Sequence, residues 1–362
     1  MKILFSMLEK MRPLFEKDGK LSRLGPIFQA ADNFFFAAPE KTKTAPFGRD
    51  PLDVKRYMSL VIIAILPSFI AAVYFFGWRI LLTLLVSYAA GGIVEVLFAV
   101  IRKEEINEGF LVTGFIFPLI LPPGLPLWLV AVGVIFGVLV GKEVFGGTGR
   151  NIFNPALVGR IFLALGYPSA MTGAWIDPAM GKWGQLLSPI RLTVAEAVTS
   201  ATPLVLAKGG TLLPPLDLFL GRVTGSAGET SVLAILLGGI FLIIVGVASW
   251  RTIVAILLSF AGLNAILHGV LPAAVSPVWF NLSAGGILFG AFFMATDPVS
   301  SPITQSGKWA YGILIGAITI LIRSFSGFVE GAMFAILLGN ICAPLIDEVV
   351  IRTRMRRYAD ER

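Results

Sequence analysis

The chain has 362 residues, of which 56% are hydrophobic and only 14% are charged. Soluble domains carry roughly 25% charged residues, so this composition excludes a cytosolic enzyme and indicates a membrane protein. With one cysteine, Cys342, and one histidine, His268, the chain cannot form an internal disulfide, hold an iron–sulfur cluster unaided or ligate a haem through two histidines. Any redox chemistry must therefore use another cofactor.

The N-terminal segment, residues 1–56, is basic and lacks the apolar core and cleavage site of a secretory signal, so we expect it in the cytoplasm. Its apolar residues between Ile3 and Phe15 recur at helical spacing among charged ones. This pattern predicts an amphipathic helix that lies on the membrane surface or, equally well, packs against a partner protein.

Ten apolar runs follow, and each is long enough to cross or enter a membrane as a helix. The third, fifth and ninth runs are short and suit half-spans or re-entrant elements covered by protein. We therefore predict an all-α polytopic membrane protein. The runs are Tyr57–Phe76, Ile80–Ile101, Phe110–Leu121, Leu127–Gly141, Pro155–Tyr167, Val232–Trp250, Thr252–Leu271, Val278–Ala295, Tyr311–Arg323 and Val329–Val349.

Lys and Arg in short loops are retained on the cytoplasmic side, which predicts the orientation. Alternation from a cytoplasmic N-terminus puts most loop cations inside, so both termini are expected in the cytoplasm and the long segment 169–231 on the opposite side of the membrane. This bias accounts for most of the net charge of +7, and no nucleic-acid partner is needed to explain it. The expected sections are 1–56, 57–168, 169–231, 232–350 and 351–362.

Five runs precede the long segment and five follow it, so the second half is expected to cross the membrane upside down, as in an inverted repeat. The third and eighth runs then correspond, and both are interrupted by Gly and Pro. Such matched broken helices point to a site near the membrane middle, although the glycines would also suit close helix packing.

Four sequence blocks carry a resemblance to a known family. They read GKEVFGGTGRNIFNPALVGR at 141–160, FFMATDPVSSPITQSGKWAYG at 292–312, NEGFLVTG at 107–114 and SATPL at 200–204. They resemble the family formed by the B subunit of the Na+-translocating NADH:quinone oxidoreductase and the D subunit of the Rnf complex. The basic N-terminal extension looks like the former, and the short join around Trp78 and Arg79 looks like the latter.

The resemblance implies a subunit of a respiratory translocase that is inactive alone and works with an NADH-oxidising flavin subunit, another FMN subunit and small membrane subunits. Electrons would pass through flavins to quinone while Na+ moves outward. In an Rnf-type complex the partners would be ferredoxin and NAD+. A solute channel or carrier is the alternative of another class, because inverted repeats with broken helices also suit permeation.

The family attaches FMN through its phosphate to a threonine, and Glu196-Ala197-Val198-Thr199-Ser200-Ala201-Thr202 matches the attachment motif with Glu in place of the usual Asp. Thr202 would be the acceptor, Ser200 and Ala201 its small neighbours, and an extracytoplasmic flavin transferase the modifying enzyme. Taken alone, Thr202 before Pro203 is also a good helix N-cap. The turn with Gly225, Ser226 and Gly228 would line this flavin site or be a plain turn.

Acids in or near the apolar runs are costly, which makes Glu95, Asp297 and Asp347 functional candidates. The resemblance implies that acids at these three positions take part in cation handling, and pairing to an Arg is the alternative. A further family acid is replaced here by Gln29.

The resemblance assigns Gly91 and Gly92 to the quinone site, with tight helix crossing as the alternative. It also implies a second, non-covalent flavin, riboflavin. The segment 146–151 with Asn154 and Pro155 is one candidate for its contacts.

Overall fold

The computed structural model describes residues 54–103, 109–178, 201–326, 328 and 331–360, and every regular element in these ranges is a helix. Six helical segments there are long and apolar enough to cross a membrane, and three further apolar helices are shorter. The predicted class, an all-α polytopic membrane protein, is confirmed. The expected N-terminal helix and Gln29 lie outside the described residues, and the inverted repeat and the five sections stay predictions.

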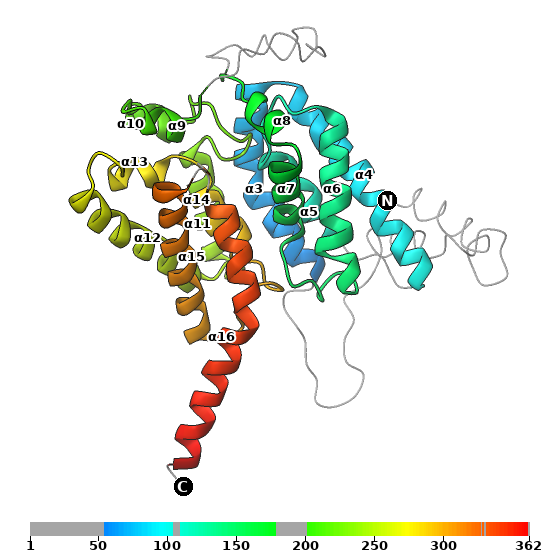
Figure 1. Cartoon of the computed structure of the whole chain (residues 1–362). Coiled ribbons are helices and arrows are strands. Elements are labelled where there is room, and N and C mark those ends of the chain that lie inside the picture. Colours follow the sequence, from blue (N-terminus) through cyan, green and yellow to red (C-terminus); the bar gives the residue numbers. More distant parts are fainter. Residues whose placement is uncertain (1–53, 104–108, 179–200, 327, 329–330, 361–362) are drawn as a thin grey trace, which may run out of the picture.

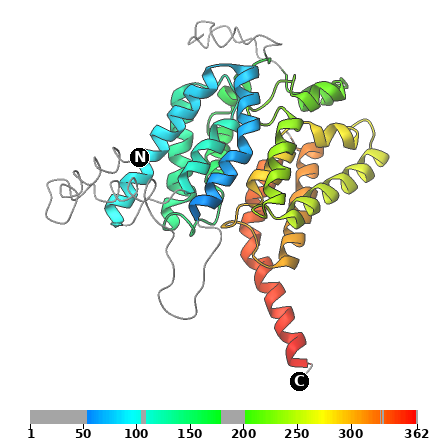
Figure 2. The same ribbon diagram turned by 180° about the vertical axis from the view of Figure 1, so that it is seen from behind.

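The helices form two groups that lie side by side (Figures 1 and 2). The first group contains α3 (Val54–Phe76), α4 (Arg79–Arg102), α5 (Gly109–Leu119), α6 (Leu127–Gly141), the short η2 (Glu143–Phe145), α7 (Pro155–Gly166) and α8 (Pro168–Gly173). The second contains α11 (Val232–Ile244), α12 (Trp250–Val270), α13 (Val278–Ser283), α14 (Ile287–Phe289), η5 (Gly290–Met294), α15 (Gln305–Phe325) and α16 (Ala332–Asp360). The short helices α9 (Pro203–Lys208) and α10 (Pro215–Leu220) come between the two groups in sequence and lie above the second group, near α13, in Figure 1.

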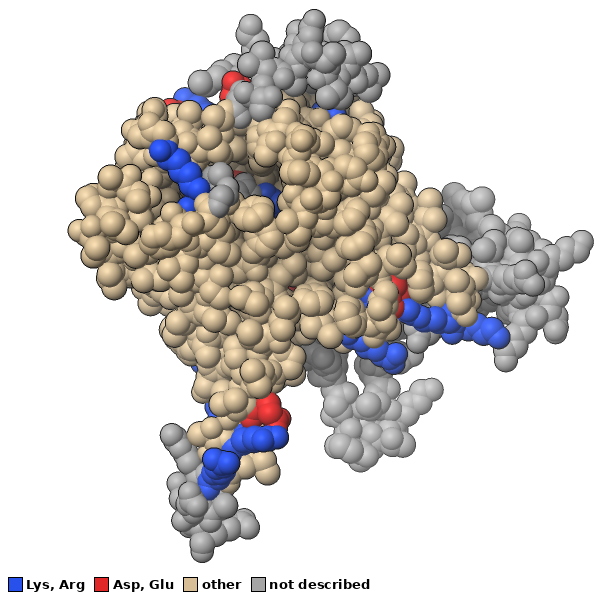
Figure 3. All heavy atoms as spheres, viewed as in Figure 1, with Lys and Arg blue, Asp and Glu red and all other residues tan. Residues whose placement is uncertain are grey.

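The two groups meet along α3 and α11, which pack directly against each other. Their backbones approach so closely that a β-carbon added to Gly238 would lie 1.8 Å from the carbonyl oxygen of Ala64. On the face seen in Figure 3, most charged atoms lie toward the upper and lower ends, with a broad uncharged band between them. An apolar band between charged ends is the surface expected of a protein that spans a bilayer.

The sixth and ninth runs differ in length from the prediction. Helix α15 has 21 residues rather than a half-span, because Thr304 caps its start by accepting a hydrogen bond from the Gly307 nitrogen at 3.1 Å. Hydropathy misses this polar first turn. Helix α11 has only 13 residues and ends at Ile244, just before Gly246 adopts a φ of 79° that favours glycine.

Helix α5 is a half-helix, as predicted for the third run. It ends at Leu119, before Pro122 and Pro123, which cannot donate the backbone hydrogen bonds of a continuing helix. The carbonyl oxygen of Leu119 accepts a hydrogen bond of 2.7 Å from Gly228, and that of Leu121 accepts one of 3.1 Å from Ala227. The turn before α11 therefore closes the end of α5.

The eighth run is broken into α13, α14 and the π-helical η5. The break follows Ser283, and Gly285 there has a φ of 70°. In η5 the nitrogen of Ala295 donates to the carbonyl oxygen of Gly290 at 2.7 Å, which is the wider spacing of a π-helix. Broken helices are tolerated in membranes where protein covers the freed backbone groups, and the residues of η5 are buried.

Candidate functional site

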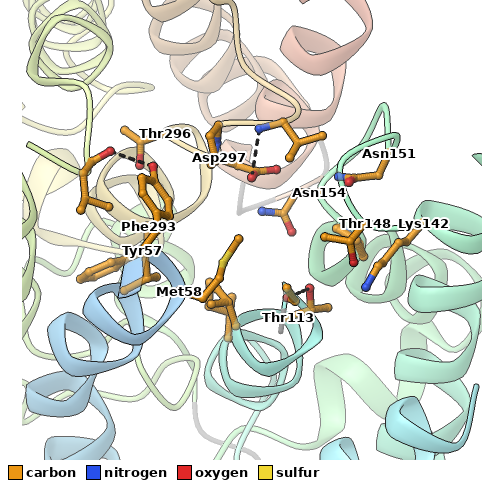
Figure 4. Close-up of a pocket in the computed structure, with 18 of the residues that line it drawn as sticks. Tyr57, Met58, Thr113, Lys142, Thr148, Asn151, Asn154, Phe293, Thr296 and Asp297 are labelled. Carbon is orange, nitrogen blue, oxygen red and sulfur yellow. Dashed lines mark hydrogen bonds between the residues drawn. The ribbon is translucent and has the colours of Figure 1, made fainter. Parts of the chain in front are cut away.

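A polar pocket lies between the two groups, at the end where α3 begins and α6 ends, and we call it the lower pocket (Figure 4). Its walls come from α3, α5, the loop between α6 and α7, the end of α11 and the loop after η5. Lys142 is its only cation and Asp297 its only carboxylate among the described lining residues, and they come from different groups. The cavity measures about 70 Å³, and the flexible Met58 projects into it.

Two asparagines follow the glycine-rich segment and line the lower pocket. The side-chain oxygen of Asn154 accepts a hydrogen bond of 3.1 Å from Ala156 and so caps α7, which leaves its amide nitrogen facing the pocket (Figure 4). The amide nitrogen of Asn151 donates to the carbonyl oxygen of Phe153 at 2.9 Å. Together with Thr148, the two asparagines place hydrogen-bond donors and acceptors on one wall of the lower pocket. This arrangement suits a planar ligand that carries both donors and acceptors along one edge.

Glu95, predicted for the ion pathway, is buried in α4 and paired with a lysine rather than with an arginine. The Lys142 ammonium lies 2.6 and 2.7 Å from its two carboxylate oxygens, and both side chains are almost fully buried. Next to this pair, the Arg102 guanidinium lies 2.8 Å from the Glu143 carboxylate. Each carboxylate thus has its own cation, and the two ion pairs together are neutral.

The two aspartates have different surroundings. Asp297 accepts hydrogen bonds from the Ser300 hydroxyl at 2.7 Å and the Val299 nitrogen at 3.4 Å, and burial raises the pKa of its carboxyl. Asp347 accepts hydrogen bonds from the backbone nitrogens of Ile303 at 2.7 Å and Thr304 at 3.1 Å, so it joins α16 to the start of α15. Neither carboxylate pairs with an Arg within the described residues, and only Asp297 lines the lower pocket.

Thr202 lies at the upper end, in a small pocket that we call the Thr202 pocket. It occupies the N-cap position of α9 before Pro203, but its side chain makes no capping hydrogen bond, and the residue is 8% exposed. The pocket is lined by Thr202 together with Gly225 and Ser226. Gly228 faces Leu119 instead, and Ala201 is exposed. Glu196 and Ser200 lie outside the described residues.

A second upper cavity of about 250 Å³ shares Leu204 with the Thr202 pocket, and we call it the Arg323 cavity. Lys208 and Arg323 line it with apolar residues of the turn before α13. The Arg323 guanidinium donates to the carbonyl oxygen of Asn281 at 2.6 Å and lies 5.3 Å from the centre of the Phe260 ring. Two cations in a cavity that no described carboxylate lines favour an anionic ligand.

A buried ion pair joins α7 to the turn that closes α5. The Arg160 guanidinium lies 3.0 Å from the Glu229 carboxylate and 3.2 Å from the Ser226 hydroxyl. Sequence analysis missed this pair, and it also missed Lys142 as the partner of Glu95. The signal was present, because charged residues inside or beside apolar runs are costly and need partners, but spacing alone does not say which residues meet.

Gly91 and Gly92 pack against the ring of Phe110 on α5. A β-carbon on Gly91 would lie 2.6 Å from that ring, and one on Gly92 would lie 3.5 Å from it. None of the three cavities described above is lined by either glycine. The close crossing of α4 and α5 accounts for Gly91, and the quinone role of both glycines stays a prediction.

We expect Gly91→Ala to destabilise the protein by about 1–3 kcal/mol, because the added methyl group forces the buried Phe110 ring to move. Gly92→Ala is the matched control, since 3.5 Å is an ordinary van der Waals distance and no neighbour has to shift. Melting temperatures of the two variants in the same detergent measure the difference. Equal melting temperatures would show that the α4–α5 crossing does not depend on Gly91.

The uncharged band, the broken helices and the lower pocket define a polytopic membrane protein with a polar site between two helical groups. The chain matches the NQR2, RnfD, RnfE family over residues 41–356, and it belongs to this family.

Named relatives align with nearly the whole chain. It is 38% identical to the B subunit of the Na(+)-translocating NADH-quinone reductase of Azotobacter vinelandii, with 98% of each chain covered. It is 38% identical to the protein of the same name from Ectopseudomonas mendocina and 37% identical to that from Klebsiella pneumoniae, with 97% of this chain and 98% of each relative covered.

Proposed function

We propose that this chain is the B-type membrane subunit of a Na+-translocating NADH:quinone oxidoreductase and relays electrons through bound flavins to quinone. The similarity to proteins of that name over 97–98% of the chain carries this proposal. The chain works within a multi-subunit complex in a bacterial inner membrane, with both termini in the cytoplasm. In that orientation the lower pocket faces the cytoplasm, and the Thr202 pocket faces outward.

Thr202 carries the covalent FMN in this proposal. Its hydroxyl is not used as a helix cap, and the Thr202 pocket adjoins the cation-lined Arg323 cavity, which suits an anionic flavin. Because Thr202 is only 8% exposed, the transferase has to act before this region packs or while it is displaced. Lys208 and Arg323 would hold the negative charge of the group, and the bound FMN would supply one-electron chemistry.

The lower pocket holds the non-covalent flavin, riboflavin. The polar edge of an isoalloxazine ring contains both N–H and C=O groups, and the pocket opposes it with the Asn154 amide nitrogen, the Asn151 side chain, Thr148 and Lys142. The present cavity is narrower than a flavin ring, and rotation of Met58 would widen it. Glu95, Asp297 and Asp347 belong to the Na+ pathway, and Gly91 and Gly92 border the quinone site.

The proposal is tested on the intact complex, expressed with its flavin transferase. We expect one FMN bound covalently to the peptide 169–231, one riboflavin per chain released by denaturation, and NADH-driven quinone reduction that requires Na+. Reduction of NAD+ by ferredoxin instead would establish the Rnf-type alternative. A colourless chain that conducts solutes in liposomes would establish a channel or carrier.

Asn154→Ser separates the two roles of Asn154. Serine keeps an oxygen that can cap α7, so the helix should remain stable, but it removes the amide nitrogen that faces the pocket. We expect occupancy by the non-covalent flavin to fall about tenfold, since one lost hydrogen bond in a buried site costs about 1–2 kcal/mol. Flavin released by acid per mole of chain measures the loss.

Ser231→Ala is the control for Asn154→Ser, because Ser231 caps α11 in the same way but does not line the lower pocket. Full flavin occupancy in Asn154→Ser would refute the flavin assignment of the lower pocket.

A further inference from the structure

Lys142 connects the buried carboxylate of Glu95 to the lower pocket. Its ammonium lies within 2.7 Å of both Glu95 oxygens, while its side chain forms part of the pocket wall next to Thr148 (Figure 4). Glu95 itself does not line that pocket. The lysine is therefore the one described charged group that belongs both to the Glu95 pair and to the pocket.

The Lys142 ammonium occupies the position that a metal cation would take on Glu95. Both carboxylate oxygens of Glu95 are in direct contact with the Lys142 ammonium, and the two side chains are only 3% and 7% exposed. Two cations on one carboxylate would leave a net positive charge in a medium of low dielectric constant, where repulsion is strong. Na+ can bind Glu95 only if Lys142 leaves.

Among the residues that the structure describes, Lys142 has one other polar environment within its surroundings, the lower pocket. The neighbouring carboxylate, Glu143, is already paired with Arg102 at 2.8 Å, whereas the pocket contains Asn151, Asn154 and the carboxylate of Asp297. A lysine ammonium sits on a flexible four-carbon stem and can change partners by rotation about its side-chain bonds. Among the described residues, the lower pocket is therefore the place where the displaced Lys142 ammonium would find new polar partners.

We propose that Lys142 is a tethered counter-cation of Glu95, which Na+ displaces into the lower pocket. This role rests on the proposed function, in which Glu95 binds Na+ and the lower pocket holds the non-covalent flavin. Each Na+ bound at Glu95 brings one positive charge toward the flavin. Since coupling between two sites is reciprocal, negative charge added in the pocket raises the affinity of Glu95 for Na+.

The test measures thermal stabilisation of the full-length chain by Na+, with choline replacing Na+ at constant ionic strength. A ligand that binds only the folded state raises the melting temperature, and the half-effective concentration reports its affinity. We expect Lys142→Met to lower that concentration about tenfold or more, because the competing charge is gone. Lys142→Arg should raise it, since guanidinium binds a carboxylate with two parallel hydrogen bonds.

Two variants serve as controls. Glu95→Gln should abolish the Na+ effect, and replacement of the exposed Lys103 by Gln should leave it unchanged. Lys142→Met leaves a buried carboxylate without its cation, and if that variant fails to fold, Lys142→Arg decides the question. A second readout is the reduction potential of the non-covalent flavin in the intact complex, which Lys142→Met should lower and Lys103→Gln should not.

The outcomes separate the two proposals. An unchanged or higher half-effective Na+ concentration in Lys142→Met, or an unchanged or lower one in Lys142→Arg, would overturn the role of Lys142 while the wild-type response to Na+ stands. A wild-type complex with no flavin and no response to Na+ would overturn the proposed function, and the role of Lys142 would fall with it.

Discussion

Thr202→Val is expected to abolish the covalent flavin completely, because valine has the shape of threonine but no hydroxyl to form the phosphate ester. Folding should change little, since the Thr202 side chain makes no capping hydrogen bond and valine keeps the branched side chain at this buried position. The measurement is fluorescence of the denatured chain on a gel under ultraviolet light, together with the mass of the peptide 169–231. Both should show an unmodified chain.

Thr230→Ala is the matched control for Thr202→Val. Thr230 is another buried threonine of the same pocket, 4% exposed, and lies before α11 rather than before α9. We expect its variant to keep the fluorescent band. A fluorescent band in Thr202→Val would show that the flavin is attached to another residue. Loss of the band in both variants would mean that attachment requires the intact pocket rather than the Thr202 hydroxyl alone.

The sequence predicted most helices well because apolar length is the dominant signal in a membrane chain. Helix α6 has the predicted bounds, α4 is one residue longer than predicted at each end, and α7 ends one residue earlier than predicted. The errors fall where a polar turn continues a helix, as in α15 with its Thr304 cap, or where glycine ends an apolar run early, as in α11 at Gly246. Hydropathy alone detects neither feature.

The candidate sites were predicted less completely, because contacts between distant segments decide them. Thr202, Gly225 and Ser226 do share a pocket, although more than twenty residues separate the threonine from the turn. Glu95 was correctly singled out as a costly buried acid, but sequence analysis did not identify Lys142 as its partner. The two residues are 47 positions apart in sequence, and nothing in the sequence indicates that they meet.

The buried charges divide between the two ends of the molecule. At the lower end, Glu95 and Lys142 lie within the first group of helices and adjoin the pocket between the groups. At the upper end, Arg160 from the first group pairs with Glu229, next to the Thr202 pocket. In the proposed function, each flavin site therefore has a buried ion pair beside it. Charge added to either flavin would act on a nearby ion pair through a medium of low dielectric constant.

Arg160→Met is expected to destabilise the protein by about 3–5 kcal/mol, because it removes a cation from a buried carboxylate that lies 3.0 Å away. The Ser226 hydroxyl also loses its partner at 3.2 Å. Both effects loosen the turn whose backbone closes the end of α5, so we also expect less FMN at Thr202. Melting temperature in detergent measures the first effect, and fluorescence of the denatured chain measures the second.

Arg160→Met combined with Glu229→Gln is the informative comparison. The double variant removes both charges, so it should be more stable than the sum of the two single changes predicts. Arg222→Met removes an exposed arginine between α10 and α11 and should cost less than about 0.5 kcal/mol. A loss below about 1 kcal/mol in Arg160→Met, or strict additivity in the double variant, would mean that this ion pair does not hold α7 against the turn before α11.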